Sequence, residues 1–384
     1  MKITGVETFQ INLPTKIVHT WAGNYSPIGR GYIVVKLHVE GGLYGVGEAQ
    51  VLKDWGGEYG SMYGETPEST RIIIHEHLAP LIVGEDVRQI ENVHRKMDKF
   101  VRGYPYAKAA LDVAMHDVVG KIYNVPVYQL LGGLVRREIP IAHSIGLMEI
   151  EQAVETAKIV SDEGIRCVKV KVGNDARRDI DLVGRIRKAL PDIRIRVDAN
   201  QGYRSWKEAV QVIRAMEDFG IWYMEQPVEG LENMARVAQA TDVPIMADES
   251  AWSAHDVLRL IAWQAAEMVS VYYTKPGGLM KSKKLTAVAE TGGLQCDING
   301  SAEMGVGNAA NLHLAASSAI IELPGTIPIT QTAEKEYTKV AGHKYADDII
   351  VDPFVYRDGH LVVPDGPGLG IELDMRKIEK YRAA

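Results

Sequence analysis

Long apolar runs and cysteines are scarce in this sequence of 384 residues. No run approaches the roughly 20 apolar residues that cross a bilayer, and the first residues lack the apolar core of a secretory signal peptide. The only cysteines, Cys167 and Cys296, are far apart and without metal-site spacing, which argues against a disulfide framework. We therefore expect a soluble, cytoplasmic protein with no membrane partner.

Blocks of like charge are also missing. The chain has 43 Lys and Arg residues and 50 Asp and Glu residues, and its formal net charge of −7 is spread without long runs of either sign. Proteins that bind nucleic acid or anionic membranes gather basic residues into patches or stripes. We therefore expect no nucleic-acid partner and favour a small molecule.

The sequence divides into three parts by its hydrophobic pattern. Residues 33–48 alternate apolar and polar side chains on both sides of a Glu-Gly-Gly turn, which predicts a β-hairpin. From Pro67 the pattern is helical, with Thr66 in the N-cap position. We predict an N-terminal α+β domain over 1–130, a catalytic barrel over 131–330 and a C-terminal segment over 331–384 that packs back on the first domain.

Eight apolar strands alternate with amphipathic helices in the middle part. Near-continuous apolar strands are typical of a parallel sheet that is covered on both faces, and eight parallel strands close into a barrel. The predicted strands are 139–145, 167–172, 193–198, 222–225, 245–248, 269–275, 294–298 and 319–323. The expected fold class is therefore α/β, a TIM-type barrel.

Polar residues follow one another at the ends of five predicted strands with the period of one βα unit. Lys171, Asp198, Glu225, Asp248 and Lys275 are separated by 27, 27, 23 and 27 residues. The carboxyl ends of parallel barrel strands meet at one mouth, where such folds carry their active sites. We therefore expect these five side chains to face one another.

Three carboxylates gathered at one mouth would repel one another unless a cation lies among them. Oxygen ligands without His or Cys favour Mg²⁺, and Mn²⁺ would also bind such a set. The alternative is that each acid caps the helix after it, but three acids at successive strand ends between two lysines favour the metal site.

The lysines would then act on the substrate. Lys171 and Lys275 would stand across the mouth from each other, where burial beside a divalent cation suits a lysine to act as a base. Lys169 shares the face of Lys171, because side chains two residues apart in a strand point the same way. Its expected role is charge support, and an ion pair with a neighbouring acid is the simpler alternative.

These motifs resemble the enolase superfamily, specifically its muconate-lactonizing, muconate cycloisomerase-like subgroup. The resemblance covers nearly the whole chain, since Tyr106–Ala114 and Leu130–Gly133 also match the stretch that joins the capping domain to the barrel in that family. The matching motifs are Lys169-x-Lys171, Val197-Asp198-Ala199-Asn200, Glu225-Gln226-Pro227, Ala247-Asp248-Glu249-Ser250 and Lys275-Pro276-Gly277-Gly278.

The resemblance implies a modified (β/α)7β barrel with an α+β capping domain built from the N-terminal region and the C-terminal tail. It implies a homo-oligomer, dimer or octamer, and a small-molecule carboxylate as substrate. The roles that it implies are Mg²⁺ ligation by Asp198, Glu225 and Asp248, acid/base chemistry by Lys171 and Lys275, charge support by Lys169, and support of the metal ligands by Glu249 and Asn200.

The implied chemistry is removal of the proton α to a carboxylate, with an enediolate stabilised by Mg²⁺ and the lysines. Muconate-type cycloisomerisation is the leading reaction. Racemisation or epimerisation of an amino-acid derivative and dehydration of an acid are the alternatives. From other classes, a Schiff-base aldolase that uses Lys171 or Lys275, and a non-catalytic barrel with a structural cation, stay open.

Substrate contacts are expected from two regions. The segment after the seventh predicted strand contributes Asp297, Asn299 and Glu303. Asp297 has no His partner of the kind that the mandelate-racemase branch uses, and Leu323–Pro328 lacks the paired aspartates of dipeptide epimerases, so both branches are disfavoured. The capping loops contribute the aromatic residues Trp21, Tyr25, Trp55 and Tyr59. His19 and His143 are more simply structural, although either would be within reach of the site.

Overall fold

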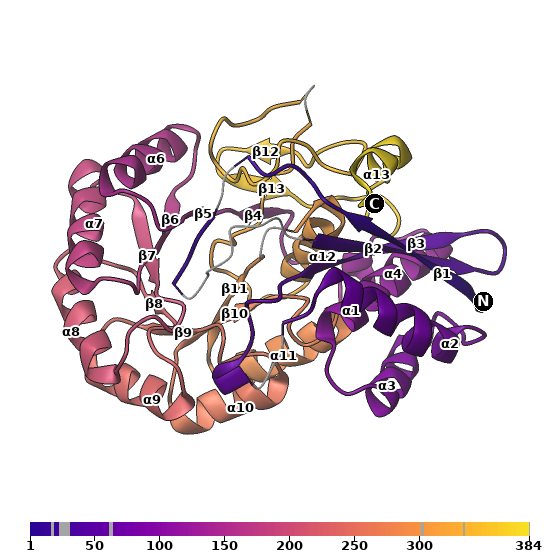
Figure 1. Cartoon of the computed structure of the whole chain (residues 1–384), viewed down its shortest axis with the longest axis horizontal. Coiled ribbons are helices and arrows are strands. Elements are labelled where there is room, and N and C mark those ends of the chain that lie inside the picture. Colours follow the sequence, from indigo (N-terminus) through magenta and orange to yellow (C-terminus); the bar gives the residue numbers. More distant parts are fainter. Residues whose placement is uncertain (17–18, 23–30, 61–63, 301–302, 333–334, 384) are drawn as a thin grey trace.

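The chain folds into an α/β barrel and an antiparallel capping unit. The computed structural model describes residues 1–16, 19–22, 31–60, 64–300, 303–332 and 335–383. Figure 1 shows the barrel helices in an arc around the central parallel sheet, with the sheet of the capping unit and its helices beside them. None of the helices in these ranges is long and apolar enough to cross a membrane.

The capping unit consists of a three-stranded antiparallel sheet and the helices that cover it. Its strands are β1 (Ile3–Ile11), β2 (Gly31–Val39) and β3 (Tyr44–Val51), paired in that order. Its helices are η1 (Glu58–Gly60), α1 (Pro67–Ile72), η2 (Ile73–Leu78), α2 (Ala79–Ile82), α3 (Ile90–Phe100) and α4 (Pro105–Tyr123). The predicted hairpin and the predicted N-cap are confirmed: the Thr66 hydroxyl accepts a hydrogen bond from the Ser69 amide.

Helix α4 packs closely against β3 because two strand positions lack side chains. A Cβ atom at Gly45 would lie 1.9 Å from the carbonyl oxygen of Ala114, and one at Gly47 would lie 1.9 Å from that of Ala110. Only glycine permits this approach. The close contact joins the sheet to the helix that leads into the barrel.

The barrel strands form one parallel seven-stranded sheet in sequence order, covered by helices on the outside. The strands are β5 (His143–Ile145), β6 (Cys167–Lys171), β7 (Arg194–Asp198), β8 (Met224–Glu225), β9 (Ile245–Ala247), β10 (Met268–Val271) and β11 (Gln295–Ile298). The helices are α5 (Val127–Leu130), α6 (Ile150–Asp162), α7 (Ala176–Ala189), α8 (Trp206–Glu217), α9 (Leu231–Ala240), α10 (Ala254–Trp263), α11 (Leu279–Thr291) and α12 (Gly305–Ala316). The α/β barrel prediction is confirmed, since the sheet runs through seven consecutive βα units.

The eighth predicted strand, 319–323, is wrong as a continuous strand. In its place the chain makes isolated parallel bridges, from Ile321 to Cys296, from Gly325 to Ile141 and from Thr326 to Asn299. Pro324 has no amide hydrogen to donate and interrupts any ladder here. The segment therefore runs between β11 and the start of β5 without forming a regular strand.

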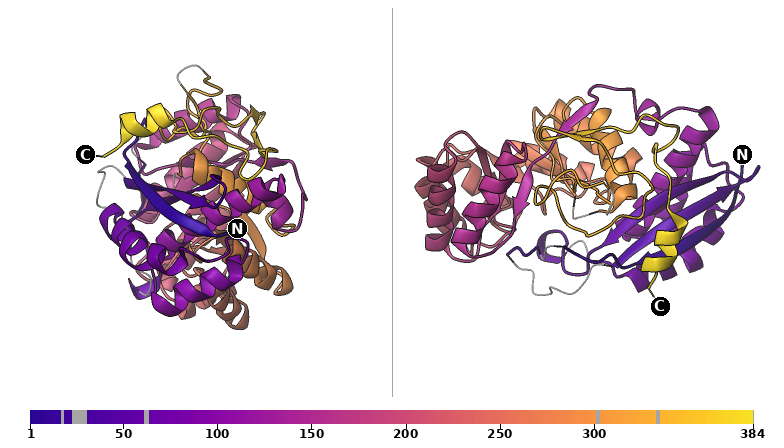
Figure 2. Two further views of the ribbon diagram at one scale, coloured as in Figure 1. Left: turned by 90° about the vertical axis from the view of Figure 1, so that its right-hand side faces the viewer. Right: turned by 90° about the horizontal axis from the view of Figure 1, so that it is seen from above.

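The tail contacts both units. Strands β12 (Tyr356–Arg357) and β13 (His360–Val362) form a hairpin that pairs with β4 (Glu138–Pro140) beside the barrel. Helix α13 (Met375–Tyr381) lies against β1 instead, and the amide of Asn12 donates to the carbonyl of Tyr381 at 2.9 Å. In the right-hand view of Figure 2 this helix lies beside the capping sheet, at the opposite end of the molecule from α7 and α8.

Candidate active site

The ends of β6, β7 and β8 bring two lysines and two acids side by side. The register aligns Lys171 with Asp198, and Asp198 with Glu225. All of them are buried, together with Lys169 one pleat earlier on β6. Alternation within β6 puts both lysines on the face of the sheet that carries the acids.

Lys169 joins two of these acids. Its ammonium lies 2.8 Å from Asp198 Oδ2 and donates to Glu225 Oε1 at 2.7 Å. Burial lowers the pKa of Lys169, but the charges of Asp198 and Glu225 outweigh that effect and hold the pKa well above its usual value. Lys169 is therefore a permanent cation in this arrangement.

Lys171 has one acid and one amide as partners. Its ammonium donates to Asp198 Oδ2 and to Asn200 Oδ1, both at 2.6 Å. The amide nitrogen of Asn200 donates in turn to Glu249 Oε1 at 2.9 Å. Asn200, held by Glu249, thus orients the ammonium of Lys171.

The remaining acid, Asp248, follows β9 directly and is held by Lys275. The ammonium of Lys275 donates to Asp248 Oδ1 at 2.8 Å, to the Asp248 carbonyl at 2.9 Å and to the Ser270 carbonyl at 2.7 Å. The prediction that Lys275 ends a strand over 269–275 is wrong, because β10 ends at Val271 and Lys275 lies in the turn that follows. Its long side chain still reaches Asp248 from that turn.

Burial and mutual repulsion separate the pKa values of the acids. Burial raises the pKa of Asp198, but Lys169 and Lys171 more than reverse this and hold it below its usual range. Burial, with the charges of Asp198 and Asp248, raises the pKa of Glu225 well above its usual value. Burial and the same two charges raise the pKa of Glu249 to about 8. Four carboxyl groups, those of Asp198, Glu225, Asp248 and Glu249, thus share this buried space, and burial with their mutual repulsion raises the pKa of two of them.

This donor set suits a hard divalent cation. It consists of carboxylates from three successive strand ends, and Oε2 of Glu225 is buried without a hydrogen-bond partner. Such oxygens are the ligands that Mg²⁺ prefers. As the side chains stand in the described ranges, no group of three or more His, Cys, Asp or Glu residues could hold a metal ion; each of the three acids accepts a hydrogen bond from a lysine instead.

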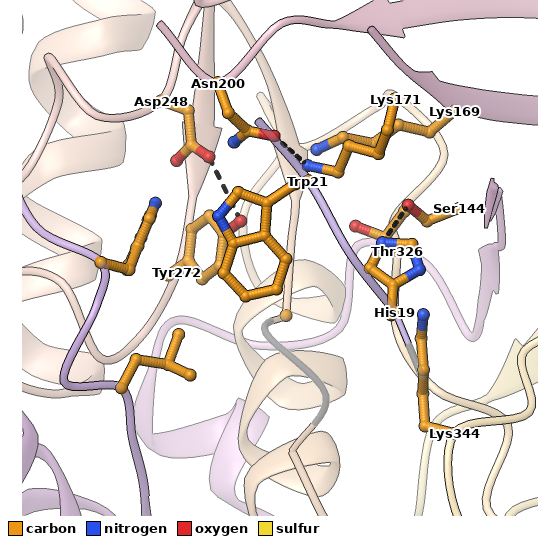
Figure 3. Close-up of a pocket in the computed structure, with 13 residues that line it drawn as sticks. His19, Trp21, Ser144, Lys169, Lys171, Asn200, Asp248, Tyr272, Thr326 and Lys344 are labelled. Atoms are coloured by element: carbon orange, nitrogen blue, oxygen red, sulfur yellow. Dashed lines mark hydrogen bonds between the residues drawn. The ribbon is translucent and has the colours of Figure 1, made fainter. Parts of the chain in front are cut away.

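A cavity opens beside these groups at the mouth of the barrel. Lys169, Lys171, Asn200 and Asp248 line one end of it. Figure 3 shows the ammonium of Lys171 directed toward Asn200 at the edge of the cavity. Lys275 is not among the described residues that line it, and its side chain is fully buried.

The capping loop over residues 52–60 closes one side of the cavity through Trp55. The indole ring lies 5.0 Å from Trp252 and 5.2 Å from Tyr272, and its N–H donates to Glu249 Oε1 at 3.3 Å. The Lys275 ammonium lies 4.7 Å from the centre of the Tyr272 ring. Trp55 therefore contacts the residues that support both lysines.

The other aromatic residues predicted to close the cavity lie in different places. Trp21 lines the cavity and crosses its centre in Figure 3. Tyr25 lies outside the described residues. Tyr59 does not line the cavity: its side chain is 74% exposed, and its amide donates to Glu229 Oε1 at 2.6 Å. Tyr59 thus attaches the capping loop to the barrel, with its side chain in solvent.

Three predicted substrate contacts are engaged elsewhere and do not line this cavity. Asp297 forms an ion pair with Arg196 at 2.9 Å inside the barrel. The side-chain amide of Asn299 donates to Ser270 Oγ at 2.5 Å. Glu303 is buried near Glu48, at the start of α12. The structure does not bring these three side chains together with Lys171.

Gly300 lines the cavity and belongs to the segment after the seventh predicted strand, from which substrate contacts are expected. The lining residues that were not singled out from the sequence are Leu52, Ser144, Tyr272, Thr326 and Lys344. Ser144 is the middle residue of β5, and the strand predicted there ends at Ile145, so the rule of polar residues at strand ends does not select it. Tyr272 directly follows β10, but the strand predicted there continues to Lys275, so the same rule selects Lys275 in its place. Lys344 belongs to the tail, where no periodic pattern indicates which side chains face the barrel.

Two family models match the chain in succession. Residues 9–132 match the mandelate racemase / muconate lactonizing enzyme N-terminal domain, and residues 151–377 match the enolase C-terminal domain-like family. An N-succinyl-L-Arg/Lys racemase from Bacillus cereus is 32% identical over 378 residues, covering 97% of this chain and 96% of the relative. Muconate cycloisomerase 1 from Rhodococcus opacus is 30% identical over 389 residues, covering 99% and 98%.

Comparison with solved structures gives the same similarity. The crystal structure of the N-succinyl Arg/Lys racemase from Bacillus cereus superposes with a TM-score of 0.90 at 30% identity, covering 100% of this chain and 99% of the other. The match of both domain models, together with relatives that are cycloisomerases, racemases and epimerases, establishes the family. The chain belongs to the mandelate racemase / muconate lactonizing enzyme family of the enolase superfamily and is an enzyme of the isomerase class.

Proposed function

We propose that this isomerase transfers a proton at the carbon α to a carboxylate, with Lys171 as the group that carries the proton. The observation that supports this role is its position: the Lys171 ammonium is at the cavity wall, 2.6 Å from both Asp198 and Asn200. Asn200 and Asp198 orient the ammonium through these two hydrogen bonds. General acid and base groups positioned in this way contribute about 10²- to 10⁴-fold to rate.

Charge that develops on the substrate requires a positive environment. Lys169 supplies one fixed cation beside Lys171, since its acid partners keep it protonated. We propose that Asp198, Glu225 and Asp248 hold Mg²⁺, with Mn²⁺ as a substitute, and that Glu249 and Asn200 support these ligands. When bound, the metal would supply positive charge that stabilises an enediolate.

Muconate-type cycloisomerisation is the reaction that this asymmetric site favours. In it, one carboxylate of the substrate adds to a double bond conjugated with the second carboxylate, and one ammonium gives its proton to the carbon α to that second carboxylate. A single lysine at the cavity wall is sufficient for this step. Lys275, which the Asp248 and Ser270 carbonyls and Trp55 enclose, acts in this proposal through its charge.

Racemisation of an N-acyl amino acid is the second candidate. It is supported by the similarity to the N-succinyl-L-Arg/Lys racemase over 97% of this chain and by the presence of a second lysine at the same group of acids. Two bases would then remove and return a proton on opposite faces of one carbon. This reaction requires Lys275 to leave its bonds to Asp248 and reach the cavity.

One experiment in D₂O with MgCl₂, followed by proton NMR, distinguishes the two candidate reactions. With cis,cis-muconate we expect a lactone that carries one deuterium, and with N-succinyl-L-lysine we expect no change. Loss of the α-proton signal of N-succinyl-L-lysine, as deuterium from the solvent replaces that proton, with muconate unchanged, would favour the second candidate. Activity that persists in EDTA, with trapping of a substrate adduct by borohydride, would replace both with Schiff-base chemistry.

A further inference from the structure

Tyr272 occupies the end of β10 at the cavity. It is the first residue after this strand, as Asp248 is the first after β9, and it shares the face of Ser270, because side chains two residues apart in a strand point the same way. Tyr272 lines the cavity, whereas Lys275 is not among the described residues that do so. At this strand the mouth of the barrel therefore presents a phenol to a ligand.

Lys171 and Tyr272 stand on opposite walls of the barrel. The sheet order places β7, β8 and β9 between β6 and β10 on one side. On the other side lie β11, β5 and, between these two, the segment 321–326 with its parallel bridges. Because equal numbers of segments separate β6 from β10 in both directions, the two strands face each other across the barrel. In Figure 3 Tyr272 and Asp248 lie on the left of the view, and Lys169 and Lys171 lie on the right.

The ring of Tyr272 is held in place, but its hydroxyl makes a long hydrogen bond. The ring centre lies 5.2 Å from that of Trp55 and 4.7 Å from the Lys275 ammonium. The hydroxyl donates to Asp248 Oδ2 at 3.3 Å, which exceeds the roughly 2.5–3.0 Å of ordinary hydrogen bonds between oxygen atoms. The hydroxyl can therefore turn from Asp248 to a substrate oxygen without displacement of the ring.

Lys275 is engaged behind these rings. An ammonium has three hydrogens to donate, and that of Lys275 donates to Asp248 Oδ1, to the Asp248 carbonyl and to the Ser270 carbonyl at 2.8, 2.9 and 2.7 Å. It also lies 6.0 Å from the centre of the Trp55 ring. Trp55 and Tyr272 line the cavity and Lys275 is not among the described lining residues, so the two rings separate its ammonium from the space for the substrate.

We propose that Tyr272 contacts the substrate on the wall opposite Lys171, where it donates a hydrogen bond to a substrate oxygen, and that Lys275 does not reach the substrate. The inference rests on the proposed function, in which Lys171 carries the proton. It adds that the α-carbon meets a proton-carrying side chain on one face only.

A single proton carrier has a stereochemical consequence. When the neutral amine of Lys171 takes the α-proton, the electrons of the C–H bond pass to the enediolate, and the proton or a deuteron returns from the same side. The lactone formed from cis,cis-muconate has two hydrogens on the carbon α to its free carboxylate, and only one of them would exchange. An N-acyl amino acid would exchange its α-proton and keep its configuration.

The first test measures this stereochemistry with the full chain in D₂O and MgCl₂. The lactone formed from cis,cis-muconate is followed by proton NMR through a long incubation, and N-succinyl-L-lysine is analysed by chiral chromatography. Incubation without the enzyme corrects for spontaneous exchange. We expect one deuterium in the lactone and no D-isomer. A second deuterium, or the D-isomer, would overturn the inference and leave the α-proton chemistry intact.

Tyr272→Phe removes the hydroxyl and keeps the ring. The matched control is Tyr273→Phe, because the hydroxyl of Tyr273 donates to the Glu48 carbonyl at 3.0 Å and this residue is not among the described lining residues. We expect Tyr272→Phe to lower kcat/KM by about 2- to 10-fold with one deuterium still incorporated, and Tyr273→Phe to match the wild type. Equal kcat/KM in the two variants, or a loss of exchange in Tyr272→Phe above about 10²-fold, which would make Tyr272 the proton carrier, would overturn the inference. Melting temperatures verify that both variants are folded.

A second test requires no turnover. Tyr272→Cys and Tyr273→Cys place a thiol at neighbouring positions, and the natural residues Cys167 and Cys296 are buried. The reaction of each variant with iodoacetamide is followed by mass spectrometry. Because alkylation follows the exposure of the thiol, we expect Tyr272→Cys to react at least about tenfold faster, and equal rates would overturn the inference. If the wild type incorporated no deuterium into either substrate, the proposed function would fail, and the thiol rates would still decide whether position 272 faces the cavity.

Discussion

Lys169 and Lys171 share one oxygen atom of Asp198. Their ammonium groups lie 2.8 Å and 2.6 Å from Asp198 Oδ2, and all three side chains are buried. The carboxylate of Asp198 in β7 thus compensates the charges of two lysines that lie two residues apart in the buried strand β6. Asp198 is the residue on which this arrangement depends.

Replacing Asp198 with Asn should destabilise the fold strongly. The substitution leaves two buried ammonium groups facing an amide, and removing one partner of a buried ion pair costs about 3–5 kcal/mol. The free energy of unfolding, measured in urea with EDTA present, gives the loss independently of any metal. Asp181→Asn, which removes an exposed partner of Arg185, should cost under about 1 kcal/mol. Equal, small losses in both variants would contradict the arrangement.

Gly278 should tolerate no side chain, because it closes the turn that carries Lys275. Its φ is +128°, its amide donates to the Tyr273 carbonyl at 2.8 Å, and a Cβ atom there would lie 2.3 Å from the carboxyl carbon of Asp112. Gly278→Ala should therefore lose more than the about 1–3 kcal/mol of a strained backbone alone, and should lose activity with it.

Gly293 provides the matched control for this substitution. Its φ is +74° and nothing lies within 4 Å of an added Cβ atom, so Gly293→Ala measures the cost of a side chain at positive φ where no atom obstructs it. Thermal unfolding of the two variants gives the comparison. If Gly293→Ala were as damaging as Gly278→Ala, the contact with Asp112 would play no part.

Trp55 should couple the capping loop to the surroundings of Lys171 and Lys275. It is 8% exposed, and truncating a buried tryptophan to alanine costs about 3–5 kcal/mol. Trp55→Ala should lower stability by such an amount and reduce kcat, while Trp55→Phe should keep most of the stability and lose the hydrogen bond to Glu249. Trp263→Ala, at a position 47% exposed, should change stability by no more than about 0.5 kcal/mol. An unchanged kcat in Trp55→Ala would show that the capping loop does not affect the catalytic step.

The spacing of strand ends predicted the acids of the candidate site well, because the βα period is a local property of the chain. Lys171, Asp198 and Glu225 follow that period and align in the observed register. Lys275 has the expected spacing of 27 residues from Asp248 but does not end a strand, because it lies in the turn after β10. Hydrogen bonds from its ammonium to the carbonyls of Asp248 and Ser270 hold it there. Turn geometry of this kind has no periodic signal in the sequence.

The sequence pattern did not predict the contacts that cross the barrel or those that the tail makes. Asp297 occupies a strand end like the other acids, but Arg196, 101 residues earlier, pairs with it in the interior. Arg196 precedes Asp198 by two residues in β7, so its side chain lies on the same face of the strand. The sequence therefore indicates that Arg196 points into the barrel but does not indicate which acid it pairs with. Lys344 reaches the cavity only because the tail returns to the capping segment.

Stability should fall with rising pH through the titration of Glu48, which joins the capping sheet to α12. Burial raises the pKa of Glu48 from 4.5 to about 8, with Glu303 and Asp348 adding to the shift and the amides of Gly307 and Met304 opposing it. Between those two values the folded state holds a proton that the unfolded state has released, so the free energy of unfolding decreases as pH rises.

Glu48→Gln removes this titration. Its free energy of unfolding in urea, measured from pH 5 to pH 8, should decline less steeply than that of the wild type. Glu76→Gln, at an exposed carboxyl of the capping unit, should keep the wild-type slope. Parallel wild-type and Glu48→Gln curves would mean that Glu48 is already ionised in the folded protein at pH 5.

The central claim is that Lys171 carries the substrate proton, and deuterium uptake tests it most directly. The wild type, Lys171→Ala and Lys188→Ala, the last at an exposed lysine of α7, are incubated in D₂O with MgCl₂ and cis,cis-muconate, and product deuterium at the carbon α to the carboxylate is followed by NMR. We predict that Lys171→Ala loses at least about 10²-fold in rate and that Lys188→Ala matches the wild type. Deuterium incorporation by Lys171→Ala at the wild-type rate would contradict the account.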